Sequence, residues 1–121
     1  MVDGKMINII YEDNHLLVVE KPVNRLVQED NTKDLDLLTE LKMYLKDTYN
    51  KPGNVYLGLV HRLDRPVGGI MVFAKTSKAA GRLSESIRNK EFNKCYLVIA
   101  DGKFDKESGV LEDYLLKNEK T

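Results

Sequence analysis

The feature that most limits how this chain can fold is the alternation of short apolar runs with two stretches of helical periodicity. Each run is rich in β-branched residues and ends at proline, glycine, asparagine or aspartate, as strands commonly do. The helical stretches follow the second run and the fourth run. Several strands interrupted by only two helices predict an α+β fold, with a mixed, largely antiparallel sheet and two packed helices.

The expected strands cover residues 7–11, 15–20, 70–74, 94–100 and 110–116, and the apolar run at residues 55–60 leads into the loop around Asp64. The first helix is expected from Leu35 to about Asn50, because Leu38, Leu41 and Leu45 recur at helical spacing. The second helix begins after an N-cap at Thr76 or Ser77, since threonine and serine oxygens accept hydrogen bonds from the first free N–H groups of a helix. No repeat divides residues 1–121, so we expect one domain.

Size and composition place the chain in a broad class without assigning a function. A chain of 121 residues with 42% hydrophobic and 31% charged side chains is typical of a folded globular domain. The single cysteine, Cys95, excludes an internal disulfide bond and is compatible with a reducing compartment. No apolar run approaches the ~20 residues of a membrane-spanning helix. We therefore expect a cytoplasmic protein that is not bound to a membrane.

The candidate chemistry lies in residues 61–69, His-Arg-Leu-Asp-Arg-Pro-Val-Gly-Gly. Arg62 and Arg65 flank Asp64, and opposite charges nearby favour the ionised form of a carboxyl group. The proline and glycines predict a turn, and the apolar run after them predicts a buried strand. Asp64 is therefore expected on a rigid loop that enters a sheet. In the alternative interpretation, Asp64 only pairs with Arg65 or caps the turn.

Positive charge is concentrated around this loop and the helix after it. Residues 61–94 contain eight basic and three acidic side chains, although the whole chain has a formal net charge of zero. Such a basic region favours a polyanion such as RNA, with candidate contacts from His61, Arg62, Arg65, Lys78, Arg82 and Arg88. A solvated lysine-rich helix face remains the simpler alternative.

Tyr96 is the second candidate for chemistry. A strand–helix–strand unit usually returns the chain beside its starting strand, so the Asp64 loop and Tyr96 are expected to face one cleft. A carboxylate can act as a nucleophile at a sugar carbon, and a phenol can transfer a proton. The alternative for Tyr96 is a strand tyrosine packed in the core. His15, His61 and the single cysteine lack metal-ligand spacing, so we expect no metal; His15 is interpreted as a strand residue and His61 as a hydrogen-bonded neighbour of the loop.

Three segments of the sequence, taken together, resemble the catalytic domain of RluA-type RNA pseudouridine synthases. Residues 61–69 match that family's motif His-Arg-Leu-Asp-Arg-x-x-x-Gly. Residues 12–22 resemble its upstream strand, which ends in Lys-Pro, and residues 94–96 match its later Lys-x-Tyr strand. The three motifs extend over residues 12–100, and their order makes the combination far more specific than any one of them.

The resemblance implies a role for each matching position. Asp64 would be the nucleophile that attacks the ribose of the target uridine, so that the base detaches, rotates and reattaches through C5. Tyr96 would stack on the base or transfer a proton, and Arg62 would hold the target nucleotide out of its stack. The implied reaction is the isomerisation of uridine to pseudouridine in ribosomal or transfer RNA, and it requires no cofactor.

The chain departs from the family pattern in two ways. Val67-Gly68 stands where many members have Thr-Ser, and no arginine follows Tyr96, although the family's last motif supplies an arginine that pairs with the nucleophile. The family's catalytic domain is also roughly twice as long. We therefore expect a truncated catalytic domain that self-associates through an unpaired sheet edge near residues 110–116. The alternatives are a non-catalytic domain that folds and binds RNA weakly, and a partner-binding domain without an RNA role.

Overall fold

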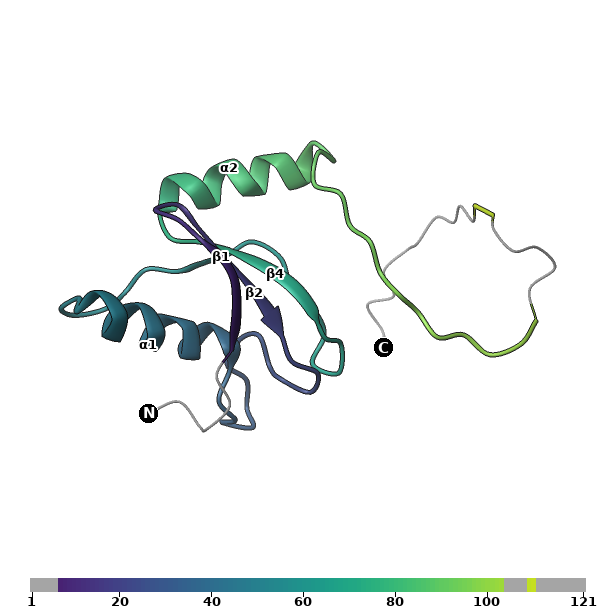
Figure 1. Cartoon of the computed structure of the whole chain (residues 1–121), viewed down its shortest axis with the longest axis horizontal. Coiled ribbons are helices and arrows are strands. Elements are labelled where there is room, and N and C mark those ends of the chain that lie inside the picture. Colours follow the sequence, from purple (N-terminus) through teal and green to yellow (C-terminus); the bar gives the residue numbers. More distant parts are fainter. Residues whose placement is uncertain (1–6, 104–108, 111–121) are drawn as a thin grey trace.

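The computed structural model describes residues 7–103 and 109–110, which form a four-stranded antiparallel sheet with two helices (Figure 1). The sheet order is β1-β2-β4-β3, with β1 at Asn8–Glu12, β2 at Leu16–Lys21, β4 at Gly69–Ala74 and β3 at Gly58–Leu59. The helices are α1 at Leu37–Tyr49 and α2 at Ser77–Arg88. This architecture confirms the expected α+β fold.

Antiparallel pairing of β2 with β4 forms the centre of the sheet. The two strands pair along their full length, from Leu16 opposite Ala74 to Lys21 opposite Gly69. Because alternate side chains of a strand point to opposite faces, the partners Leu17 and Phe73 share one face, and Leu16 and Ala74 share the other. The sheet therefore offers two faces, and each receives one helix.

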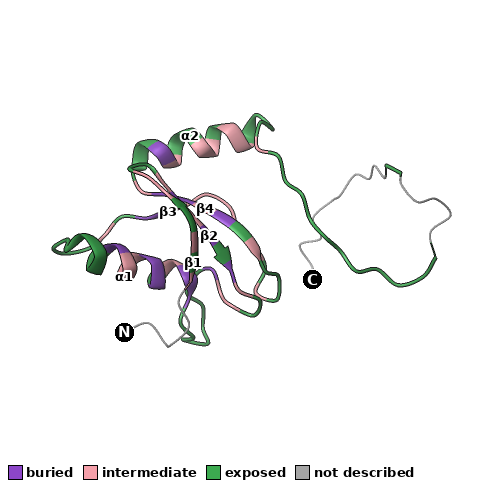
Figure 2. Ribbon diagram, viewed as in Figure 1, coloured by how far each residue is buried: buried purple, intermediate pink, exposed green. Residues whose placement is uncertain are grey.

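The main core lies between one face of the sheet and α1 (Figure 2). Its buried members are Leu17, Val19, Val27, Leu37, Leu41, Leu45, Leu57, Met71 and Phe73. The Asp36 side chain caps α1 by accepting a hydrogen bond from the Thr39 N–H. At the other end Asn50 adopts the left-handed conformation, with φ of 51°, that commonly terminates helices. The predicted helix is thus confirmed, two residues shorter at its start.

α2 packs against the other face, beside β3 and β4. Thr76 caps it by accepting a hydrogen bond from the Ala79 N–H, so of the two expected N-caps the first is the one used. A Cβ added to Gly58 would lie 3.1 Å from the Ala80 Cβ. The glycine in β3 therefore allows the helix to approach the sheet closely.

A carboxylate at the end of β1 ties α1 to the sheet. The Glu12 carboxylate accepts hydrogen bonds from the Tyr44 hydroxyl (2.7 Å), the Tyr49 hydroxyl (2.5 Å) and the Lys75 Nζ (2.7 Å). Burial favours a higher Glu12 pKa, but these hydrogen bonds outweigh burial and lower it. The same contact raises the pKa of Tyr44 to about 12. We call these four residues the Glu12 clamp.

One expected strand is not borne out, and another lies almost wholly outside the described residues. Residues 94–100 form no strand, and residues 93–103 are exposed along their length, with Leu97 and Ile99 fully accessible. A strand exists only where its N–H and C=O groups pair with a neighbour, and no strand among residues 7–103 pairs with this segment. Of the strand expected at residues 110–116, Val110 is not in a strand and the rest lies outside the described residues.

Over the same described ranges, neither helix has the length and apolar character that crossing a bilayer requires.

Candidate active site

The segment around Asp64 alternates between packed and exposed side chains. His61 and Leu63 are half-buried, and Leu63 packs against the core. Arg62, which lies between these two residues, and Asp64, which follows Leu63, are exposed. The alternation places the guanidinium and the carboxylate of the motif on the solvent side, while their neighbours hold the segment to the sheet.

His61 supports the edge of β4. Its Nε2 accepts a hydrogen bond from the Val72 N–H at 3.0 Å, and its ring meets the Phe92 ring edge-on, with centroids 5.4 Å apart. Burial, with a smaller contribution from the charge of Lys94, lowers the pKa of His61. The interpretation of His61 as a hydrogen-bonded neighbour of the loop is confirmed. Its contact with RNA remains a prediction.

A buried lysine holds the turn that follows Asp64. The Val67 N–H donates to the Asp64 carbonyl at 2.9 Å, which closes the predicted turn. Lys21, only 1% exposed at the end of β2, donates from Nζ to the carbonyls of Pro22 (3.1 Å), Arg65 (2.9 Å) and Val67 (2.7 Å). The Lys-Pro motif and the Asp64 motif are therefore parts of one structure, which we call the Lys21 anchor. The sequence pattern showed both motifs but not this contact.

The charge of Lys21 is balanced only in part. Burial lowers its pKa, and the positive charges of Arg25 and Arg65 lower it further, whereas the carboxylate of Asp64 opposes them. Arg25 itself forms an ion pair with the buried Glu40 of α1. The ammonium of Lys21 is thus held chiefly by carbonyl dipoles, with Asp64 as its favourable charged neighbour.

Arg65 turns away from Asp64. Its Nη2 lies 2.7 Å from Asp34 Oδ2, and its Nε donates to the Asn24 carbonyl at 3.4 Å. The alternative in which Asp64 merely pairs with Arg65 is therefore not what the structure has. Within the described part of the chain, the Asp64 side chain forms no hydrogen bond or ion pair. Its carboxylate is held in place by the backbone and remains open to solvent.

Gly68 gives a structural reason for one departure from the family pattern. A Cβ at this position would lie 3.0 Å from Val23 Cγ1 and 3.2 Å from the Lys21 carbonyl oxygen. The turn therefore packs tightly against the end of β2, and a side chain at this position would require its neighbours to shift.

Apolar side chains surround the turn on its open side. Val23 is 69% exposed, Ile70 63% and Val67 39%. Exposed apolar groups beside a free carboxylate are suited to contact with a flat, partly apolar ligand such as a nucleobase. Sequence reasoning missed them, although strand alternation would have placed Ile70 on the face opposite Met71 and Phe73.

Of the remaining basic candidates, Lys78 and Arg82 lie on the first half of α2, which begins beyond the other end of β4. The Asp64 turn precedes Gly69, whereas α2 follows Ala74. With a rise of about 3.3 Å per residue, the strand separates its two ends by roughly 17 Å. Lys78, Arg82 and Arg88 are exposed on α2. The structure thus separates Lys78 and Arg82 from the Asp64 turn, whereas the chain beyond Arg88 returns to His61 through the contact with Phe92.

Tyr96 is 59% exposed and lies in the segment that leaves the sheet after α2 (Figure 1). The strand expected to bring it back beside Asp64 is not formed among residues 7–103. The expectation that the two face one cleft is therefore not met, because no neighbouring strand draws the segment in.

The described residues contain no group of three or more histidine, cysteine, aspartate or glutamate side chains arranged to hold a metal ion.

Comparison with known proteins identifies the family. A profile described as RNA pseudouridylate synthase matches residues 15–121. The chain belongs to the RNA pseudouridine synthase family. The chain is 34% identical over 111 residues to the ribosomal large subunit pseudouridine synthase C of Vibrio cholerae, covering 92% of this chain and 33% of the relative. It is 33% identical over 110 residues to the Escherichia coli K12 protein of the same name, covering 91% and 33%.

A solved structure shows the same relationship. The human RNA pseudouridylate synthase domain containing 4 superposes with a TM-score of 0.59 at 27% identity, over 69% of this chain and 30% of the human chain. The chain thus spans about a third of the length of the curated relatives it matches.

Proposed function

We propose that this domain isomerises uridine to pseudouridine in RNA, with Asp64 as the nucleophile. The observation that carries the proposal is the state of the Asp64 carboxylate: it is exposed, free of partners among the described residues, and mounted on a turn that the Lys21 anchor immobilises. A nucleophile must be accessible and correctly placed, and a rigid turn supplies that placement without occupying the carboxylate.

The chemistry conserves every atom of the substrate. A carboxylate oxygen of Asp64 attacks C1′ of the ribose while the N1–C1′ bond breaks, and its electron pair leaves on N1 of the uracil. The detached base rotates and C5 forms the new bond to C1′ while the C1′–O ester bond breaks, which regenerates the Asp64 carboxylate. C5 then loses its proton and N1 gains one. No oxidant or reductant takes part.

Arg62 is proposed to hold the target nucleotide outside the RNA stack. Its guanidinium is exposed two residues before the nucleophile, and extrusion of a base costs a few kcal/mol that such a contact must offset. Arg65 is proposed to act mainly by positioning the turn, since its guanidinium is bound to Asp34.

The substrate is proposed to be ribosomal RNA, with transfer RNA as the alternative. The names of the Vibrio cholerae and Escherichia coli relatives refer to the large ribosomal subunit, which supports testing that RNA first.

The test is pseudouridine formation on unmodified large-subunit ribosomal RNA and transfer RNA transcripts, measured by nucleoside chromatography. Asp64→Asn removes the nucleophile while keeping its size, and Asp47→Asn makes the same change at an exposed position of α1. We expect product from the parent chain and from Asp47→Asn, and none from Asp64→Asn. Equal product from Asp64→Asn would overturn the assignment of the nucleophile.

A second candidate function is RNA binding without catalysis. The exposed position of Tyr96, outside the sheet, favours it, because the family's tyrosine is expected at the reacting base. Absence of product in all three samples, with RNA affinity retained, would support this alternative.

A further inference from the structure

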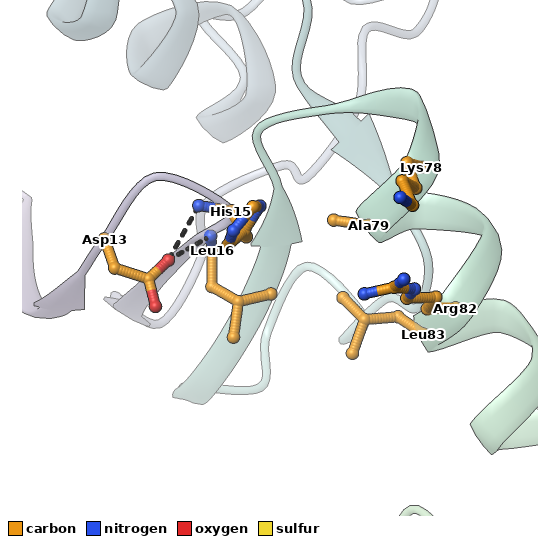
Figure 3. A pocket seen from close by; sticks show the side chains of 7 residues that line it. All are labelled: Asp13, His15, Leu16, Lys78, Ala79, Arg82 and Leu83. Carbon is orange, nitrogen blue, oxygen red and sulfur yellow. Dashed lines mark hydrogen bonds between the residues drawn. The ribbon is translucent and has the colours of Figure 1, made fainter.

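A pocket of about 260 Å³ lies between the β1–β2 turn and the first half of α2 (Figure 3). It is lined by Asp13, His15, Leu16, Lys78, Ala79, Arg82 and Leu83. Figure 3 shows that the first three come from the hairpin and the others from α2, with the Arg82 guanidinium extended toward the hairpin. His15 lies in the turn itself, one residue before β2, rather than in the strand as expected.

The lining combines an apolar floor with basic groups at its margin. Leu16, Ala79 and Leu83 provide the floor, and Lys78 and Arg82 provide the positive charge. Neither cation forms a hydrogen bond or ion pair with another residue in the described ranges. Both are therefore available to a ligand.

The one acidic group of the lining is already engaged. Asp13 Oδ1 accepts hydrogen bonds from the N–H groups of His15 and Leu16, both at 2.7 Å, and Oδ2 accepts one from the Tyr11 hydroxyl at 2.8 Å. These hydrogen bonds, those from the backbone first, lower the pKa of Asp13. The carboxylate thus serves the turn, and the groups left for a ligand are cationic, aromatic or apolar.

We infer that this pocket binds one unpaired nucleotide of the RNA, several positions away from the target uridine. The base lies on the apolar floor between the His15 imidazole and the Arg82 guanidinium, and the adjacent phosphate contacts Lys78. Bases stack on histidine rings and on guanidinium planes, and phosphates pair with lysine. The volume is many times the ~15 Å³ that one water molecule needs, and it accommodates a single pyrimidine ring.

The inference rests on the proposed function, because it takes RNA as the substrate, but it concerns a different part of the surface. The pocket lies at the end of the sheet where Leu16 pairs with Ala74, and the Asp64 turn lies at the end where Lys21 pairs with Gly69. The separation of roughly 17 Å corresponds to about five nucleotides at the spacing of a stacked strand. The pocket would therefore read RNA that flanks the target.

The experiment measures binding of a labelled single-stranded RNA hexamer to the full chain, with the same sequence as a duplex for comparison. Methyl NMR signals of Leu16, Ala79 and Leu83 should shift on addition of the single strand and not of the duplex. His15→Ala should weaken binding about fivefold or more through lost stacking, without changing the salt dependence. Lys78→Gln should reduce the slope of log affinity against log salt by about 0.7, as loss of one phosphate contact requires.

The matched control is Lys46→Gln, which removes the same charge from an exposed position on α1, on the opposite face of the sheet. It should bind the hexamer like the parent chain. Absence of pocket methyl shifts, or parental affinity in His15→Ala, would overturn the inference even if pseudouridine forms. Hexamer binding at the pocket without pseudouridine formation would instead contradict the proposed function alone.

Discussion

The turn that carries Asp64 and the segment that carries Tyr96 both match motifs of one family, yet the structure treats them differently. The turn is held by two hydrogen bonds from the buried Lys21, to the carbonyls of Arg65 and Val67. Residues 93–103 extend from the end of the domain and are exposed throughout. The difference shows that a motif residue is held in a fixed position only when neighbouring groups in the fold supply hydrogen-bond partners for its backbone. The turn has those partners within residues 7–74, whereas an extended strand needs another strand beside it.

The largest effect is expected from removing the Lys21 anchor. Lys21→Met leaves the carbonyls of Pro22, Arg65 and Val67 without their donor, so the free energy of unfolding should fall by about 3 kcal/mol. Urea unfolding measures this, and Lys46→Met at an exposed site is the control. A loss below about 0.5 kcal/mol would mean that the turn is held by other contacts, like an ordinary surface loop.

The same substitution, glycine to alanine, should have opposite effects on stability in the Asp64 turn and in α2. Gly68→Ala should destabilise the domain by about 1 kcal/mol, because the new methyl group meets Val23 and the backbone of Lys21. Gly81→Ala should stabilise it by about 1 kcal/mol, because a Cβ on this exposed turn of α2 meets nothing within 4 Å and alanine favours the helix. Thermal unfolding of both variants would test the predicted opposite signs.

A smaller effect is expected from His61 as the pH falls. Its pKa is lowered in the folded state, so below about pH 6.5 the unfolded chain binds more protons. The stabilisation is therefore present above that pH and is lost as the pH falls through the folded pKa. His61→Gln keeps an acceptor for the Val72 N–H without titrating. Between pH 7 and 5 its stability should decline less than that of the parent chain, and an identical decline would show that His61 contributes no pH dependence.

The smallest effect on stability is expected in the exposed segment. Leu97→Ser and Ile99→Ser change side chains that are fully accessible, so each should alter the free energy of unfolding by less than about 0.5 kcal/mol. Hydrogen exchange should correspondingly show fast amides at residues 94–100 and a protected Val72 amide. Destabilisation by 2 kcal/mol or more would indicate that the segment packs against the domain in solution.

Local sequence patterns correctly predicted the strands and the helix whose pairing and packing partners lie within the described fold. β-branched runs located β1, β2 and β4, and the spacing of Leu38, Leu41 and Leu45 located α1. The fifth run, at residues 94–100, has an equally strong strand pattern and forms no strand. Composition reports whether a segment suits a sheet, but the sheet must also offer an unpaired neighbour in the right place.

The candidate site was predicted in part, for a similar reason. The turn after Asp64 followed from its proline and glycines, and the exposed carboxylate agrees with the role expected of it. The partner of Arg65 did not follow, because Asp34 is distant in the sequence and only the fold brings it within 2.7 Å. The anchoring of the turn by Lys21 also depends on the pairing of β2 with β4, which neither motif predicts.

The Glu12 clamp also gives this protein an optical signal of its own. The chain has no tryptophan and six tyrosines, so the long-wavelength part of its near-ultraviolet absorbance, beyond that of phenylalanine, comes from tyrosine. Two of the six donate to one carboxylate, and Tyr44 should ionise only near pH 12 while that contact survives. A spectrophotometric titration in alkali would therefore follow the junction of α1 with β1 without any label. In Glu12→Gln, Tyr44 should begin to ionise at lower pH. This shift would show that the junction of α1 with β1 loosens before the sheet itself unfolds.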